Sequence, residues 1–157
     1  MSATSAPFGL RPAFHPSGLD RAQALAGGIV SGFSSDILKG QPVKYVTGGQ
    51  IEPAAAGVSF VGAFAGVEFT DTTGRRRVSN YWPASTAYQT GSCVAYFYND
   101  PNIVYEIQAA GSLAQTSVGD MADLSNTTAG STTTGLSACT LSTSLVGAGN
   151  SAQTAIS

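Results

Sequence analysis

The stretch VSFVGAFAGVEFTDTTGRRRVSNYW, residues 58–82, gives the strongest structural signal in this chain. Its first half is a run of β-branched and aromatic residues that Gly62 and Gly66 interrupt. Glycines inside a strand often mark bulges or bends where a sheet curls. Residues 70–74 favour a tight turn, and residues 77–82 return as a second strand. The stretch therefore predicts an antiparallel hairpin in the core of a curled sheet.

Shorter strand patterns flank this hairpin. Residues 43–47 alternate between two turns, and residues 22–33 favour strand because their glycines are unfavourable inside a helix. Residues 93–98 are rich in β-branched and aromatic types, and an Asn-Asp-Pro-Asn turn leads to residues 103–108. These two runs predict a second hairpin. We expect an all-β protein whose body, residues 21–111, is a small antiparallel barrel or sandwich.

Two further segments differ from this body in composition. Residues 1–20 contain three prolines and two glycines, which favours an extended arm. The arm also holds Phe8, Leu10 and Phe14, which a disordered tail usually lacks. We expect it to lie across a neighbouring subunit or another protein. Residues 112–157 are rich in Ser, Thr and Gly, which predicts a flexible segment with one or two strands that order against partner chains.

Charge is scarce along the whole chain. Only 10% of the 157 residues are charged, the net charge is −2, and no charged residue follows Asp123. A freely soluble monomer normally carries well-mixed surface charge, so we expect much of this surface to be covered when the protein works. A polar, uncharged face can be buried without desolvating ions. The acidic balance argues against nucleic acid as the main partner, because binding a phosphate backbone requires a basic face.

Residues suited to catalysis are few and scattered. His15 is the single histidine, and no carboxylate or thiol lies within a few residues of it, which predicts a structural role. The acid pairs Glu68/Asp71 and Asp120/Asp123 match neither a glycosidase pattern nor a calcium loop. We therefore expect no enzymatic activity, cofactor or metal.

The cysteines and the N-terminus bear on the compartment. Cys93 and Cys139 lie far apart and show no metal-ligand spacing. We expect both to be small buried residues, and a disulfide between them remains open. Residues 1–10 lack the basic start and apolar core of a secretory leader, and no run of 18 apolar residues occurs. We expect a protein of the cytoplasm, or of a particle assembled there, with no membrane contact.

Two motifs are candidates for partner contact. Arg75, Arg76 and Arg77 follow a Thr-Gly turn. They form either a solvated hairpin tip or an anchor onto an acidic partner surface. Tyr81 and Trp82 belong to the core and its rim, to a protein interface, or to a sugar-stacking surface.

Longer stretches of the chain resemble a known family. They are APFGLRPAFHPSG at 6–18, ILKGQPVKYVTGG at 37–49, VGAFAGVEFTDTTGRRRVSNYWPAST at 61–86 and VAYFYNDPNIVYEIQ at 94–108. Over about residues 6–135 the chain is similar to the small cement, or head decoration, proteins that coat the icosahedral shells of tailed bacteriophages, including cyanophages.

The resemblance implies a β-rich body that binds the outside of the capsid, often as trimers at local threefold positions, without enzymatic activity. The partners would be the major capsid protein of the same phage and further copies of this chain. The protein would then be located on the outer surface of the virion. On this interpretation, deleting residues 1–20 leaves a folded body that no longer binds shells.

The residues that we expect at contacts with the shell or a neighbouring subunit come from the arm and from the first hairpin. They are Phe8, Leu10, Arg11, Phe14, Arg75, Arg76, Arg77, Tyr81 and Trp82. The alternative function is a carbohydrate-binding or adhesion module of a virion that uses Tyr81 and Trp82.

Overall fold

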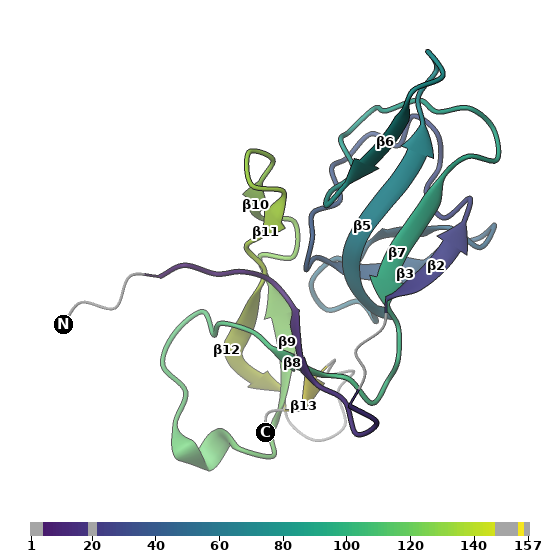
Figure 1. Cartoon of the computed structure of the whole chain (residues 1–157). Coiled ribbons are helices and arrows are strands. Elements are labelled where there is room, and N and C mark those ends of the chain that lie inside the picture. The colour runs from purple at the N-terminus through teal and green to yellow at the C-terminus, as the bar shows by residue number, and fades with distance from the viewer. Residues whose placement is uncertain (1–4, 19–21, 147–153, 156–157) are drawn as a thin grey trace.

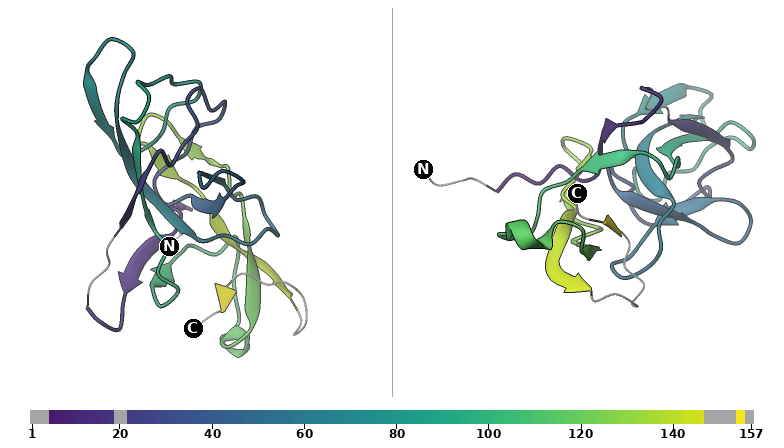
Figure 2. Two further views of the ribbon diagram at one scale, coloured as in Figure 1. Left: turned by 90° about the vertical axis from the view of Figure 1, so that its right-hand side faces the viewer. Right: turned by 90° about the horizontal axis from the view of Figure 1, so that it is seen from below.

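The computed structural model describes residues 5–18, 22–146 and 154–155. In these ranges the chain forms antiparallel β-sheets and one short 3-10 helix, η1 (Gln115–Ser117), which confirms the predicted all-β class. The sheets do not close into a barrel and instead give a sandwich-like body. Figure 1 shows a large sheet beside a smaller one, and Figure 2 shows the same arrangement from two other sides.

The large sheet has six strands, in the order β2-β7-β5-β3-β4, with β6 also paired to β5. Their bounds are β2 (Gln23–Ala26), β3 (Pro42–Tyr45), β4 (Ile51–Pro53), β5 (Gly62–Thr70), β6 (Arg76–Ser79) and β7 (Val94–Tyr98). The long central strand β5 pairs with β7 along one side and with β3 and then β6 along the other. The β5–β6 hairpin predicted from the sequence is therefore confirmed.

A β-bulge between Phe64 and Gly66 sets which side chains of β5 enter the core. In a regular strand Phe64 and Val67 would point to opposite faces, since successive side chains alternate. The bulge adds one residue and shifts this alternation. As a result Phe64, Val67 and Phe69 all pack in the same buried cluster. The bend predicted from the interrupting glycines thus occurs at Gly66.

Trp82 lies at the centre of this larger core, fully buried at 0% exposure. Its ring centroid is 5.3 Å from that of Phe69 and 6.0 Å from that of Tyr88. The backbones of Trp82 and Ile37 exchange two hydrogen bonds of 2.8 and 3.0 Å, and the Tyr88 hydroxyl donates to the Ile29 carbonyl at 2.6 Å. These bonds fasten two loops over the face of the large sheet that carries the core.

Three smaller groups of strands complete the fold. The small sheet has the order β12-β9-β13, and two further pairs are β1-β8 and β10-β11. The bounds are β1 (Arg11–Phe14), β8 (Val104–Glu106), β9 (Met121–Ser125), β10 (Gly130–Ser131), β11 (Leu136–Ser137), β12 (Thr140–Val146) and β13 (Thr154–Ala155).

A second core lies beneath these strands and joins all three predicted segments. Leu10 comes from the arm and Ala63 from the body, while the C-terminal segment supplies Leu124, Cys139 and Leu141. The arm, body and C-terminal segment therefore share one core. The strands predicted in residues 112–157 pair with one another inside the chain.

Part of the N-terminal arm packs on its own chain, whereas its expected contact with a neighbouring subunit or another protein stays a prediction. Leu10 is only 3% exposed, and its backbone N–H donates to the Gly40 carbonyl at 2.8 Å. Gly9 has a φ of +74° and lies so close to Gly40 that an added Cβ would be 2.6 Å from the Gly40 carbonyl oxygen. Residues 1–4 and 19–20 of the predicted arm lie outside the described residues.

The second predicted hairpin is wrong. β7 lies between β2 and β5, whereas β8 pairs with β1, with Pro12 opposite Tyr105. The turn between β7 and β8 forms as expected, because the Asp100 carboxylate accepts from the backbone N–H of Asn102 at 2.8 Å. The arm supplies the partner strand for β8, and β7 finds two partners within the large sheet.

Both cysteines are buried and unpaired, as expected for small apolar residues. Burial raises the pKa of the Cys139 thiol to about 12 and also raises the pKa of Cys93. We expect Gly9→Ala to lift the arm from the second core and to accelerate labelling of Cys139 by a thiol reagent roughly tenfold, with Cys93 unchanged. The measurement is residue-resolved mass spectrometry of the labelled protein.

Gly18→Ala is the matched control for this experiment. Gly18 also lies in the arm at a positive φ, of +75°, but an added Cβ there meets nothing within 4 Å. Its labelling rates should equal those of the wild type. Equal acceleration of both cysteines by Gly9→Ala, or none, would contradict the packing of the arm on the second core.

Candidate interaction surface

The nine residues expected at contacts do not form one site. Leu10 and Trp82 are buried in the two cores, so their side chains do not face a partner, which corrects their assignment as contact residues. Phe8 and Tyr81 are half-buried. The exposed members of the set are Arg11, Phe14, Arg75, Arg76 and Arg77. The arm and the β5–β6 hairpin lie at opposite ends of the molecule (Figures 1 and 2).

In the arm, charge is paired and an aromatic ring is left in solvent. Arg11 forms an ion pair with Glu106 of β8, and its guanidinium lies 4.7 Å from the centroid of the Phe8 ring. Phe14 is 59% exposed and lies opposite Val104, which is also exposed. Phe14 and Val104 therefore form an exposed apolar pair at one end of the β1-β8 ladder, whereas the charged pair Arg11 and Glu106 lies at the other end.

His15 joins the arm to the turn that follows β7. Its Nε2 lies 2.9 Å from Asp100 Oδ2, and its Nδ1 accepts from the Ser17 backbone N–H at 3.0 Å. Because Nδ1 is an acceptor, the proton of the neutral ring lies on Nε2 and points to Asp100. Hydrogen bonds from Asn102 and then His15 lower the pKa of Asp100. Sequence reasoning missed this partner because Asp100 is 85 positions away.

At the opposite end, Asp71 organises the turn of the β5–β6 hairpin. Its Oδ1 accepts from the Thr73 backbone at 2.9 Å, from the Thr73 hydroxyl at 2.6 Å and from the Arg75 backbone at 3.0 Å. Its Oδ2 accepts from Arg77 Nε at 3.0 Å. These bonds hold the pKa of Asp71 well below its usual range, and the bond from the Thr73 hydroxyl has the largest effect. The sequence Asp-Thr-Thr-Gly thus closes a turn with one carboxylate.

Asp71→Asn is expected to lower the melting temperature at pH 7 by a few degrees and to reduce the further loss at pH 3. The folded pKa of Asp71 is depressed. Its stabilisation is therefore complete above about pH 4 and is lost as the pH falls toward the folded pKa. Thermal unfolding at the two pH values measures this, with Asp120→Asn as the exposed control. If Asp71→Asn lowered the melting temperature by the same amount at pH 7 and at pH 3, the role given to Asp71 would be contradicted.

The three arginines of this hairpin are exposed but not equivalent. Arg76 pairs with Glu68 across the hairpin, and Arg77 pairs with Asp71. Within the described part of the chain, no carboxylate forms an ion pair with Arg75. We call Arg75–Arg77 the arginine tip. It presents one free guanidinium and two that are partly neutralised.

A further exposed surface was not singled out from the sequence. Val118, after η1, is 54% exposed, and Met121 and Leu145 are exposed where β9 begins and β12 ends. Leu145 lies opposite Ala122 and Met121 lies opposite Val146, so Met121 and Leu145 are neighbours along the ladder but on opposite faces of the small sheet. We call Val118, Met121 and Leu145 the apolar end. Alternation in short, hydroxyl-rich strands gives too weak a signal to predict which of their apolar residues stay in solvent.

Among the described residues, no three His, Cys, Asp or Glu side chains lie together as a metal ion would need. None of the helices in the described ranges is long and apolar enough to cross a membrane. A scan of protein-family models and searches of curated proteins and of solved structures found no match to this chain.

Proposed function

We propose that this chain is a capsid cement, or decoration, protein. It binds the outer surface of an assembled icosahedral phage head as a homotrimer and stabilises the shell against the pressure of packed DNA. The observation that carries the proposal is the apolar end, together with Phe14 and Val104, on a half of the molecule that has few charges. The stretches at 37–49 and 61–86, which resemble cement proteins, support the choice of partner.

The surface of this half suits burial. Apolar side chains gain roughly 25 cal/mol for each Å² removed from water, whereas buried charges carry a desolvation cost. Near the arm, Arg11 forms an ion pair with Glu106, and the Asp100 carboxylate is hydrogen-bonded to His15 and to the Asn102 backbone. No charged residue follows Asp123 in the sequence. The exception is Asp120, which lies between Val118 and Met121 and is exposed without an ion pair to a described residue, so a partner that covers this half has to pair its carboxylate or leave it in solvent.

The stabilisation follows from mass action. A protein that binds the assembled shell, and not dispersed subunits, shifts the assembly equilibrium toward the shell by RT ln(1 + [L]/Kd) for each site. Contacts repeated in a trimer strengthen one another, because each further contact forms within the same complex. In this proposal the apolar end joins copies of the chain, and the arginine tip contacts acidic shell surface.

The test uses shells that lack this protein, incubated with the purified chain and then sedimented. Val118→Asp places a charge in the apolar end and is expected to weaken shell occupancy by about tenfold or more. The matched control is Val30→Asp, because Val30 is also exposed but belongs to a loop of the large-sheet side. Circular dichroism checks that both variants fold. Full occupancy by Val118→Asp, or no binding by the wild type, would overturn the proposal.

A further inference from the structure

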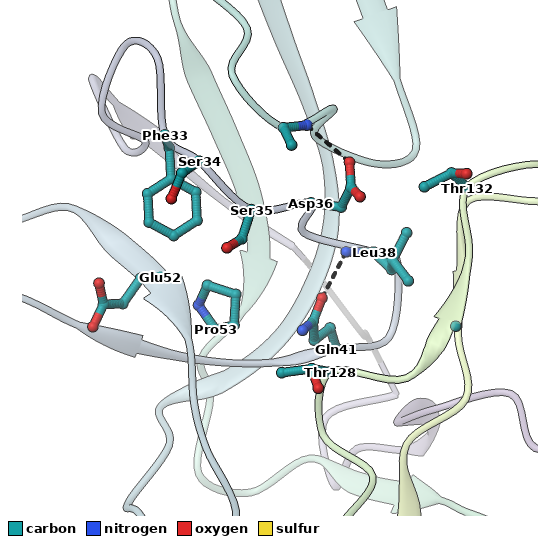
Figure 3. Close-up of a pocket in the computed structure, with 12 residues that line it drawn as sticks. Phe33, Ser34, Ser35, Asp36, Leu38, Gln41, Glu52, Pro53, Thr128 and Thr132 are labelled. Carbon is teal, nitrogen blue, oxygen red and sulfur yellow. Dashed lines mark hydrogen bonds between the residues drawn. The ribbon is translucent and has the colours of Figure 1, made fainter.

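A cleft of about 480 Å³ lies apart from the apolar end and the arginine tip. One wall is the loop that carries Phe33 and Asp36, and a second is formed by Gln41 and Glu52 beside β3 and β4. The third wall is the segment of Thr128 to Thr132, which contains β10 of the β10–β11 hairpin. Figure 3 shows these side chains around one shared space.

The floor of the cleft holds the side chain of Gln41, a largely buried residue whose amide donor opens into the cleft. Gln41 is only 2% exposed, and its Oε1 accepts from the Leu38 backbone N–H at 2.8 Å. This bond fixes the orientation of the amide, since an N–H donor requires the oxygen at that place. The Nε2 group therefore points away from Leu38, as Figure 3 shows. No described residue accepts a hydrogen bond from it, and it is not among the fully buried atoms without a partner, so this donor opens into the cleft.

The rim adds acceptors, hydroxyl groups and an aromatic face. Asp36 Oδ1 accepts from the Ala84 backbone at 2.8 Å, and its other oxygen has no hydrogen bond to a described residue. Glu52 is half-buried beside Lys44 at 3.1 Å. Thr128 is exposed and lines the lower side. Phe33 packs partly against the larger core and presents the rest of its ring to the cleft.

The walls of the cleft are held in place by the fold. The Lys39 backbone donates to the Gly135 carbonyl and accepts from Ser137, each at 2.9 Å, which docks the β10–β11 hairpin onto the body. The Asn80 side chain donates to the Thr134 carbonyl at 3.0 Å. A Cβ added at Gly130 would lie 2.5 Å from the Leu136 carbonyl oxygen, so β10 packs closely against β11 at this point. Because these contacts form the cleft in advance, a ligand would not have to order it.

We propose that this cleft binds a neutral saccharide unit. Sugar hydroxyls donate to the carboxylates of Asp36 and Glu52 and accept from the Gln41 amide, while the C–H face of the ring lies on Phe33. Asp36 has no ion pair to a described residue and disfavours an anionic ligand, while Lys44 partly neutralises the charge of Glu52. A basic side chain would pair with the carboxylates but would leave the Gln41 donor without an acceptor. This activity goes beyond shell binding. It also relocates the sugar site expected at Tyr81 and Trp82, because Trp82 is buried.

The experiment titrates the isolated, ¹⁵N-labelled full chain with the methyl glycosides of glucose, galactose, mannose and N-acetylglucosamine. At least one is expected to shift the Phe33, Gln41 and Thr128 signals saturably, with a Kd on the order of 1 mM. Asp36→Asn keeps the shape and the acceptor for Ala84 but replaces the free oxygen with a donor. It is expected to weaken binding about tenfold or more. Asp120→Asn, which alters an exposed acid away from the cleft, should bind like the wild type.

Three results would overturn the proposal. The first is the absence of saturable shifts at the cleft with all four glycosides. The second is equal weakening by Asp36→Asn and Asp120→Asn. The third is saturation of the cleft by N-acetyl-arginine amide and not by the glycosides, which would assign it to a basic peptide. The titration involves no capsid, so its outcome is independent of the shell-binding test.

Discussion

Replacing Gly62 by alanine is expected to lower the free energy of unfolding by more than about 3 kcal/mol. Gly62 begins β5, where that strand pairs with the end of β7. An added Cβ would lie 1.4 Å from the Tyr98 carbonyl oxygen and 2.5 Å from its carbon. Both are backbone atoms, so no side-chain rotation relieves the overlap. The two central strands of the large sheet would have to separate at this end.

Urea denaturation measures the effect, and Gly111→Ala is its control. An added Cβ at Gly111 meets only the Thr143 methyl group, at an ordinary contact distance of 3.4 Å. Gly111 does not have a positive φ, so alanine can adopt its backbone conformation. This variant should therefore stay within about 0.5 kcal/mol of wild type. If Gly62→Ala were as stable as Gly111→Ala, the close approach of β5 and β7 would be wrong.

Trp82→Ala is expected to cost about 3–5 kcal/mol of unfolding free energy. Trp82 is the largest fully buried side chain, and it packs on Phe69 and Tyr88. Its removal would leave a cavity beneath the two loops that its backbone helps to fasten. Because it is the only tryptophan, fluorescence of the wild-type protein reports on this core alone. We expect a blue-shifted emission that acrylamide quenches weakly.

Trp82→Phe separates packing from hydrogen bonding. The indole Nε1–H is buried, and no described residue accepts from it. Phenylalanine keeps an aromatic ring and removes this unpaired donor, so its cost should be clearly smaller than that of alanine. The same denaturation assay compares the two. Emission typical of a water-exposed indole, or full stability of Trp82→Ala, would contradict the burial and restore Trp82 as a surface contact.

Features that depend on neighbouring residues could be predicted from the sequence. The β5–β6 hairpin followed from the apolar run before Asp-Thr-Thr-Gly and the return strand after it, and Asp71 indeed closes that turn. The interrupting glycines indicated a bend, which the bulge at Gly66 provides. The exposure of Arg75–Arg77 also followed, because a short charge run beside a turn seldom lies in a core.

Features that depend on distant partners could not be predicted. β8 follows β7 after a short turn, yet its partner is β1, more than eighty positions earlier in the chain. Leu10 is apolar in a proline-rich stretch, and only the fold shows that the second core covers it. The cleft draws Asp36, Gln41 and Thr128 from separate segments. Local spacing carries no signal for such contacts, because they arise from tertiary packing.

The number of copies of this chain in a virus particle bears on the proposed function without relying on any variant. Quantitative mass spectrometry would be applied to density-purified particles of a tailed phage that encodes the chain. A trimeric cement protein at local threefold positions predicts about one copy for each major capsid subunit. A ratio of roughly a few copies per hundred subunits would indicate a tail or fibre component. That ratio, or the absence of the chain from the particles, would contradict a shell-covering role.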